Sequence, residues 1–543
     1  MWECRVEVPA LWRTAASSDN VLFPKKVGPD MLRFFGQSLQ GEAYVRKLML
    51  LVFVVLSSVA LTAQVTLPRV LSSHMVIQRD LPVHVWGTAA PGEPVSVSFR
   101  GEQRGIETDP LGHWSIYLKP GPAGGPFQLS VKGIPSSGAA EPPITLDDIM
   151  VGDVWVASGQ SNMEFPLSHA ATAAQDVPNS TNAQIRLLMI RKRSSDYAMP
   201  DADTDGWALS TPDTAKDFSA VAWYFARDIA SRQHVTVGVI DATWGGTVGE
   251  SWVRLTALGE DASLAPIFVA RGKMTDKAAD AVPEEKDEQR QIAEAKAAGK
   301  VPPQFPWHPP LNSWGPGLLW NGMIAPLTPL PIRGVIWYQG ESNSALARVH
   351  SYDRIMRTLI EDWRREWGVG DFPFLYVQIS NYISTPLEDW AELRDQQVRT
   401  LAMRNTAMAV TIDIGNPTDV HPTDKLDVGL RLARAARALS YGEAVEYAGP
   451  MFRQAAPEGG SIRAYFDHAE ALKASGGAPT GFEIAGRDGR YVPATATIDG
   501  ATIVASSPEV PVPVRMRYGW ANSPHCNLFN GEGLPASPFT SER

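Results

Sequence analysis

The chain has 543 residues, of which 44% are hydrophobic and 20% are charged, as is typical of a soluble globular protein. A chain of this length is expected to divide into two to four domains. The formal net charge of −10 argues against nucleic-acid binding, because contacts with a phosphate backbone require a basic surface. We therefore expect no nucleic-acid partner.

The first 63 residues are predicted to be a leader that ends in a secretory signal peptide. Residues 48–63 form an apolar run that follows Arg46 and Lys47, and small residues precede Gln64. A basic flank, a short apolar core and a small-residue end are typical of signal peptides. The run is short for a membrane span. The mature chain is thus expected to begin near Gln64, to be secreted or periplasmic, and to have no membrane span.

The beginning of this leader is unusual. Residues 1–44 lack hydrophobic periodicity, and we expect translation to start at Met31 or Val45 instead. Of the two cysteines, Cys4 falls in the leader, so Cys526 has no partner for an intrachain disulfide in the mature chain.

After the leader, the sequence pattern changes twice. Residues 65–146 and 443–543 contain short alternating runs broken by Gly and Pro, which predicts an N-terminal β-domain and a C-terminal β-rich region. Between them, at 147–442, apolar runs alternate with amphipathic helices, which predicts an α/β domain with a parallel sheet. The expected strands are 151–157, 185–190, 235–241, 334–337, 374–378 and 406–411, and the expected helices are 220–232, 350–367, 388–404 and 425–439.

Residues 260–312 are predicted to be an insertion in the α/β domain. Residues 283–300 are highly charged and rich in helix formers, as in a solvated helix. The proline-aromatic segment at 302–310 is interpreted as a rigid linker, in preference to a rim of the active site. The 17 tryptophans of the chain are compatible either with sugar-binding clefts or with buried cores.

The most informative motif is Ser-Gly-Gln-Ser-Asn-Met-Glu at 158–164, directly after an apolar run. A strand that stops at a tight turn would hold Ser161 at the carboxyl end of the sheet, where open α/β folds bind ligands. A serine there acts as a nucleophile if a histidine reaches it and backbone N–H groups face the oxyanion. The alternative is an ordinary helix cap.

Three further motifs follow predicted strands. They are Trp-Gly-Gly-Thr at 244–247, Trp-Tyr-Gln-Gly-Glu-Ser-Asn at 337–343, and the segment from Asp413 to Pro422, which contains Asp-Val-His-Pro. Each alone is a weak signal. Together they place Ser, Gly-Gly, Gln/Glu/Asn and Asp/His at one edge of one sheet, which is the convergence that acyl transfer requires.

With these four motifs the sequence resembles the sialate O-acetylesterase family of the SGNH (GDSL-like) hydrolase superfamily. Two further segments fit, Leu-Ser-Ser-His-Met-Val-Ile-Gln-Arg at 71–79 and Tyr-Gly-Trp-Ala-Asn at 518–522, so the resemblance covers roughly 65–540. It implies a three-layer α/β/α SGNH-hydrolase domain flanked by β-domains. It also implies the release of acetate from O-acetylated sugars such as sialic acid.

The resemblance also implies roles for single residues. Ser161 would be the nucleophile, and His421 would be the general base that later protonates the leaving alcohol. The oxyanion would be held by the N–H of Ser161 and of a glycine in the pair Gly245 and Gly246. A side-chain amide from the third motif would complete the oxyanion hole, and both Gln339 and Asn343 are candidates.

The acid that orients His421 is expected to be Asp419, with Glu341 and Asp413 as alternatives. Many SGNH enzymes have an Asp three residues before the histidine, but Thr418 stands there in this sequence. Asp424 and Lys425 are interpreted as the start of a helix. The sequence contains no metal-binding, phosphate-loop or dinucleotide-binding motif, so neither a metal nor a cofactor is expected.

Three functions fit these observations. The first is a serine carbohydrate esterase that deacetylates a glycan, with sialate O-acetylesterase activity preferred. The second is an acetyl-xylan or other polysaccharide O-deacetylase on the same fold. The third is a carbohydrate-binding protein without catalysis, in which the β-domains and tryptophans do the binding. The oligomeric state does not follow from the sequence.

Overall fold

The computed structural model describes residues 64–134, 142–269, 287–288, 290–303 and 312–542. The predicted leader and signal peptide at 1–63 lie outside the described residues, as do much of the predicted insertion and most of its proline-aromatic segment. Among the helices that the structure describes, none has the length and apolar character needed to cross a membrane.

An antiparallel β region opens the described chain. Its strands have alternating buried and more exposed residues, as in Pro94–Phe99, where Val95, Val97 and Phe99 are buried. Strand β3 pairs with β4 on one side and β6 on the other, and β2 pairs with β5. The strands are β1 (Val76–Gln78), β2 (Val83–Thr88), β3 (Pro94–Phe99), β4 (Glu102–Glu107), β5 (His113–Leu118) and β6 (Gly124–Gly133).

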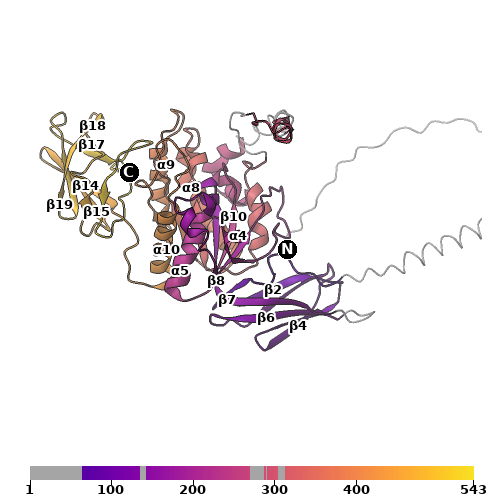
Figure 1. Cartoon of the computed structure of the whole chain (residues 1–543). Coiled ribbons are helices and arrows are strands. Elements are labelled where there is room, and N and C mark those ends of the chain that lie inside the picture. The colour runs from indigo at the N-terminus through magenta and orange to yellow at the C-terminus, as the bar shows by residue number, and fades with distance from the viewer. Residues whose placement is uncertain (1–63, 135–141, 270–286, 289, 304–311, 543) are drawn as a thin grey trace, which may run out of the picture. The chain divides into compact units, whose positions relative to one another are not determined.

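The long strand β7 (Ile144–Gly159) connects this region to the central sheet. Its first half pairs antiparallel with β6 and parallel with β1. Its second half pairs parallel with β10 and β11. The expected domain boundary at 146 therefore falls inside a strand, because one continuous strand serves the N-terminal β region and the sheet that carries the site (Figure 1).

The central sheet has the strand order β13-β12-β11-β7-β10-β8-β9. Its neighbouring strands are parallel except for β9, which is antiparallel to β8. The expectation of a parallel sheet is corrected to a mixed one, because the connection from β8 to β9 contains no crossover helix to carry the chain back. These strands are β8 (Asn182–Met189), β9 (Ala208–Ser210), β10 (Val237–Thr243), β11 (Gly334–Tyr338), β12 (Phe374–Val377) and β13 (Thr406–Ala409).

Helices cover both faces of this sheet. On one face, α5 (Ala220–Gln233) and α10 (Leu426–Tyr441) lie side by side and pack on residues such as Trp155 (Figure 1). On the other face, α8 (Tyr352–Trp367) and α9 (Trp390–Thr400) share an apolar cluster with Val154 and with the N-terminal β region. Successive side chains of β7 point to opposite faces of the sheet, so they pack alternately into the two apolar cores. The expected strands and the four long helices are confirmed to within four residues at each end, except that β7 begins at Ile144, seven residues before the expected start.

Short helices complete the α/β region. Further α-helices in the described chain include α2 (Ser161–Glu164), α3 (Ala173–Asp176), α4 (Pro212–Ala215) and α6 (Leu255–Glu260). The 3-10 helices are Leu167–His169, Gly249–Trp252, Ala262–Leu264, Ala325–Leu327, Glu341–Asn343 and Val349–Ser351, and Trp320–Ile324 is a π-helix.

A second antiparallel β region follows α10 and has its own apolar core. It is tied to α9 by Arg394, which is fully buried and donates to the carbonyl oxygens of Ile379, Ser380, Ala521 and Asn522 at 2.7–3.0 Å. Its strands are β14 (Met451–Glu458), β15 (Ser461–Asp467), β16 (Lys473–Ala474), β17 (Phe482–Ala485), β18 (Tyr491–Pro493), β19 (Thr495–Asp499), β20 (Thr502–Ser506), β21 (Arg515–Tyr518), β22 (Leu528–Phe529) and β23 (Phe539–Thr540).

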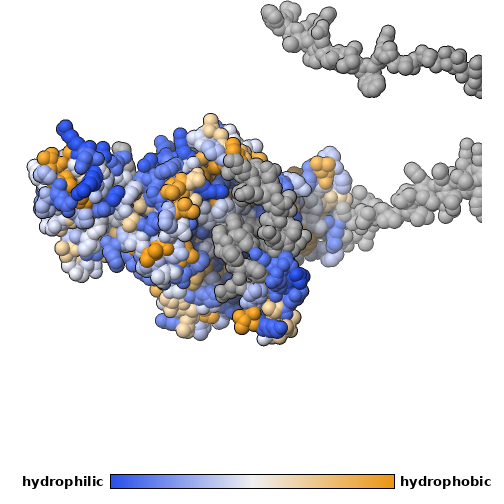
Figure 2. Space-filling view, turned by 90° about the horizontal axis from the view of Figure 1, so that it is seen from above, coloured by the Kyte–Doolittle hydropathy of each residue, from blue (hydrophilic) through white to orange (hydrophobic). Residues whose placement is uncertain are grey.

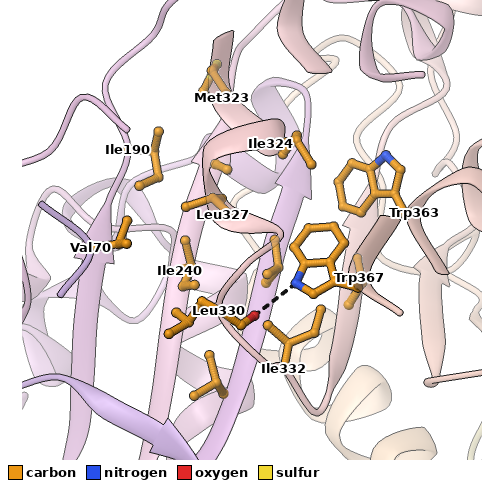
Figure 3. Packing of buried hydrophobic residues seen from close by; sticks show 14 of the residues in the cluster. Val70, Ile190, Ile240, Met323, Ile324, Leu327, Leu330, Ile332, Trp363 and Trp367 are labelled. Carbon is orange, nitrogen blue, oxygen red and sulfur yellow. Dashed lines mark hydrogen bonds between the residues drawn. The ribbon is translucent and has the colours of Figure 1, made fainter. Parts of the chain in front are cut away.

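Many tryptophans lie in the interior. Figure 3 shows Trp367 beside Leu330 and Ile332, with Trp363 next to Trp367, and the Trp367 indole N–H donates to the carbonyl oxygen of Leu330 at 3.1 Å. The largest fully buried side chains include Trp155, Trp223, Trp252, Trp320, Trp337, Trp363 and Trp390. For these seven, the core interpretation is correct. The face of the molecule in Figure 2 is mostly hydrophilic, with apolar residues in small scattered groups.

Replacing Trp363 with alanine is expected to lower the free energy of unfolding by about 3–5 kcal/mol. The indole is fully buried against Trp337 and Trp367, and its N–H donates to the carbonyl oxygen of Trp252 at 2.8 Å. The substitution would leave a cavity and an unpaired carbonyl. Denaturant unfolding measures the loss, with Leu111→Ala as the control because Leu111 is 79% exposed. Equal stability of the two variants would contradict the prediction.

Candidate active site

The four sequence motifs meet at one edge of the central sheet. They follow β7, β10, β11 and β13, and these strands run parallel, so their carboxyl ends lie at the same edge. Strand β7 lies between β10 and β11. The sheet extends from β7 through β10 to β8 and β9 on one side and through β11 to β12 and β13 on the other, so the strand order reverses at β7. Such a switch point is where open α/β sheets bind ligands.

The turn after β7 positions Ser161. Gly159 has a φ of +129°, and a Cβ at this position would lie 2.2 Å from the carbonyl oxygen of Tyr338, so only glycine fits between the strands. Ser161 is the first residue of α2, and its side chain is half-buried. The N–H groups at a helix start have no intrahelical partner. The turn therefore leaves both the hydroxyl and the backbone N–H of Ser161 at the sheet edge.

His421 contacts this serine directly. The distance from Ser161 Oγ to His421 Nε2 is 2.8 Å, although the two residues are 260 positions apart. Burial and then the nearby Lys425 ammonium lower the pKa of His421, whereas Asp419 and Glu164 oppose this effect. This lowered pKa favours the neutral imidazole, which is able to accept a proton from the hydroxyl.

The three candidate acids have different environments. Asp419 Oδ1 is 3.9 Å from His421 Nδ1 and accepts the backbone N–H of His421 at 2.9 Å. Asp413 forms a two-pronged ion pair with Arg431, with both distances at 2.7 Å. Glu341 is buried, and its Oε1 accepts the side-chain N–H of Asn162 at 2.5 Å. Of the three, Asp419 lies within ion-pair distance of the imidazole.

The glycine pair lies next to the serine. A Cβ on Gly245 would lie 3.2 Å from Ser161 Cβ, so the absence of a side chain permits this approach. The N–H of Gly245 donates to the carboxylate of Glu164, which also pairs with Lys192. Gly246 has a φ of +71°, and its carbonyl oxygen accepts the indole N–H of Trp314 at 2.6 Å. In this state the Gly245 N–H is occupied.

Both side-chain amides proposed for the oxyanion hole are engaged elsewhere. Asn343 accepts the N–H of Gly249 at 2.9 Å and donates to Glu250 at 2.9 Å. Gln339 donates to the side-chain oxygen of Asn343 at 2.7 Å and accepts the Tyr352 hydroxyl at 2.8 Å. Neither side chain is exposed. Gln339 and Asn343 are therefore part of a buried hydrogen-bond network beneath the site.

Sequence reasoning missed Gln160, whose side chain joins the first and third motifs. Its Oε1 accepts from the side chain of Gln339 at 3.1 Å and from the backbone N–H groups of Gly340 and Ser342 at 3.3 and 3.2 Å. Sequence reasoning also assigned no role to Asn162 or Glu164, and placed Lys425 at a helix start. Gln160, Asn162 and Glu164 stand in the first motif and Lys425 lies three residues after the fourth, which was the available signal.

Trp314 and Arg348 form a partly exposed wall near the glycine pair. The Arg348 guanidinium lies 4.7 Å from the centre of a Trp314 ring and pairs with Glu250 at 2.8 Å.

Within the described ranges, no group of three or more His, Cys, Asp or Glu residues is arranged to hold a metal ion. Cys526 is a free thiol in the described part of the chain.

A histidine-bonded serine at the carboxyl edge of a mixed α/β sheet is the arrangement of the α/β enzymes that hydrolyse esters. Residues 312–438 match the family described as carbohydrate esterase, sialic acid-specific acetylesterase. A carbohydrate acetylesterase from Xanthomonas citri is 37% identical and covers 88% of this chain and 100% of its own, with a TM-score of 0.76. The chain belongs to the family of carbohydrate esterases known as sialic acid-specific acetylesterases.

Mammalian relatives are also similar over most of the chain. The sialate O-acetylesterase of Mus musculus is 28% identical over 87% of this chain and 93% of its own length. The sialate O-acetylesterase of Homo sapiens is 28% identical over 86% of this chain and 91% of its own length. The similarity thus includes both β regions, and the family implies an acetylated sugar as the substrate.

Proposed function

We propose that this protein is a serine esterase that removes O-acetyl groups from glycans, most specifically from sialic acid, on an SGNH-type three-layer domain. The observation that carries the proposal is the 2.8 Å contact between Ser161 Oγ and His421 Nε2. A hydroxyl and an imidazole at this distance have the geometry of a nucleophile and its general base. The apolar run at 48–63 supports the further proposal that the enzyme is exported.

In the proposed reaction, Ser161 Oγ attacks the acetyl carbonyl carbon while His421 Nε2 takes the hydroxyl proton. The tetrahedral intermediate collapses, the bond to the sugar oxygen breaks, and His421 returns the proton to that oxygen. The acetyl group is then bound to Ser161. A water molecule attacks it, again with His421 as the base, and acetate leaves with the serine restored. No metal or cofactor is needed for these steps.

The negative charge that develops on the acetyl oxygen needs N–H donors. The N–H of Ser161 and one N–H of the pair Gly245 and Gly246 are the proposed donors. If Gly245 is the donor, then Glu164 must release it when substrate binds, since its carboxylate accepts that N–H in the structure. Asp419 is the proposed acid that orients the imidazole and stabilises its charged form, since it lies nearest to His421 Nδ1.

Sialic acid is the preferred substrate because relatives over most of the chain are named sialate O-acetylesterases. A second candidate is another O-acetylated polysaccharide, such as acetylated xylan. It is supported by the Xanthomonas citri relative, which has the higher identity and is described as a carbohydrate acetylesterase without a named sugar.

Acetate release from 9-O-acetylated sialic acid and from acetylated xylan, measured side by side, tests this proposal. We expect the higher kcat/KM on the sialic acid. Release only from xylan would replace the preferred substrate with the second candidate. No hydrolysis of either sugar or of 4-nitrophenyl acetate would favour a binding protein without catalysis.

The pH dependence of kcat/KM is expected to rise through the titration of His421, with a midpoint below the ordinary histidine value of about 6.5. Only the neutral imidazole accepts the serine proton, and burial and Lys425 lower the pKa of His421. Activity is thus lost as the pH falls through this lowered pKa. Initial rates at low substrate concentration across the acid range measure the midpoint. A profile that stays flat across that range would contradict a histidine base.

A further inference from the structure

Asn162, the residue after Ser161, is the centre of a buried polar group. Its side-chain N–H groups donate to Glu341 Oε1 at 2.5 Å and to the carbonyl oxygen of Val420 at 3.0 Å. Its side-chain oxygen accepts the Lys425 ammonium at 2.6 Å. Val420 directly precedes His421. Asn162 therefore connects the turn that carries the serine with the segment that carries the histidine.

Lys425 is almost completely buried, with 1% of the residue exposed. Its ammonium lies 4.7 Å from the centre of the Phe165 ring and 5.5 Å from that of Tyr338. Burial lowers the pKa of Lys425 to about 7, although Glu341, Asp419 and Asp424 each raise it. Burial raises the pKa of Glu341. Both groups are thus kept in an environment that disfavours their charged forms.

A helix start does not explain this lysine. Lys425 is the N-cap of α10, and its side chain makes no capping hydrogen bond there. Ser, Thr, Asp and Asn are the preferred N-caps, and a cation is disfavoured at a helix N-terminus. Burying a lysine and a glutamate also costs desolvation energy that apolar side chains would avoid. Residues that depart from the usual capping and burial preferences occur mainly at functional sites.

We propose that Lys425 and Glu341 act on catalysis through Asn162, as positioning residues that hold the Val420–His421 segment against Ser161. This inference rests on the proposed function, in which Ser161 and His421 react. Lys425 fixes the oxygen of the Asn162 amide and Glu341 fixes one of its N–H groups, so the other N–H points to the carbonyl oxygen of Val420. The Lys425 charge acts as well, because it disfavours a proton on His421.

The charges that face His421 are those of Lys425, Asp419 and Glu164. Lys425 opposes protonation of the imidazole, whereas the two carboxylates favour it. Removing the lysine charge is therefore expected to make the imidazole easier to protonate. A residue that served only the stability of α10 would not change the titration of His421.

A double-mutant cycle tests the positioning role. Lys425→Met and Asn162→Ala are each expected to lower kcat/KM for 4-nitrophenyl acetate by about 10²-fold on the alkaline plateau, because small displacements of reacting groups have effects of that size. The double variant is expected to be no slower than Asn162→Ala alone, since the lysine acts through the asparagine. If the losses of the two single variants instead multiplied in the double variant, the proposal would be overturned.

The pH dependence of kcat/KM tests the effect of the Lys425 charge on His421. Lys425→Met is expected to move the acid limb of kcat/KM to higher pH, and Lys473→Met, the same change at an exposed lysine of the C-terminal β region, is expected to leave it in place. An unmoved limb in Lys425→Met, or a shift to lower pH, would overturn the proposal.

If Lys425→Met does not fold, the isosteric Glu341→Gln replaces it in the pH test. This change removes a charge that raises the pKa of Lys425. The lysine is then neutral over more of the pH range, and the limb is again expected to move to higher pH. An unmoved limb would overturn the proposal. Failure of the proposed function would look different, because Ser161→Ala would then keep full activity.

Discussion

Replacing Ser161 with alanine is expected to lower kcat for acetyl esters by about 10⁴- to 10⁶-fold, with the fold retained. The alanine has no oxygen to form the acetyl-enzyme, so only substrate binding and the N–H donors would still promote hydrolysis by water. The side chain is half-buried, and its hydroxyl bonds to His421 rather than to a structural group. Burst kinetics and steady-state acetate release measure the loss.

The matched control is Ser168→Ala, the same change at an exposed serine seven positions further along the chain. It should hydrolyse 4-nitrophenyl acetate at the parent rate. Thermal unfolding of both variants checks that the fold persists. If Ser161→Ala hydrolysed acetyl esters as fast as the parent, Ser161 would not be the nucleophile, and another hydroxyl would have to be sought at the same sheet edge.

Replacing His421 with asparagine is expected to reduce kcat by a similar factor of about 10⁴ to 10⁶. The asparagine removes the base that takes the serine proton and the acid that protonates the leaving sugar. Because the two residues act as one unit, the variant with both Ser161→Ala and His421→Asn is expected to be no slower than either single variant.

The histidine control is His113→Asn in β5 of the N-terminal β region, where the side chain is largely exposed. It should leave kcat and KM unchanged. The remaining pH dependence of His421→Asn adds a second readout, because the acid limb should disappear with its titrating group. A limb that persisted in this variant would assign the titration to a different residue.

Fold and site followed from the sequence to different extents. The alternation of apolar runs and amphipathic helices predicted the strands and the four long helices, because these patterns are local. The sheet was expected to be parallel and is mixed, since the direction of β9 depends on a connection without a helix. The single strand β7 also crosses the expected boundary at 146, because its first half pairs with β6 and β1 and its second half with β10 and β11, and these pairings are not local in the sequence.

The assignment of side-chain roles was less complete. Gln339 and Asn343 were proposed for the oxyanion hole, but each is engaged with partners from other segments. Asp413 was an alternative acid and pairs with Arg431 instead. Lys425 was placed at a helix start and reaches Asn162 in the interior. In each case the deciding partner is far away in the sequence, and a motif does not specify it.

The sequence by itself determined that four motifs end at one sheet edge, because the carboxyl ends of parallel strands necessarily meet there. Together with the resemblance to the sialate O-acetylesterase family, this predicted Ser161 and His421 as nucleophile and base, and the two side chains lie 2.8 Å apart in the structure. Only the tertiary structure decided which amides, carboxylates and ammonium groups are free to act. Each polar group in a buried site binds the nearest complementary group, and that neighbour is set by packing between segments that are up to 263 residues apart.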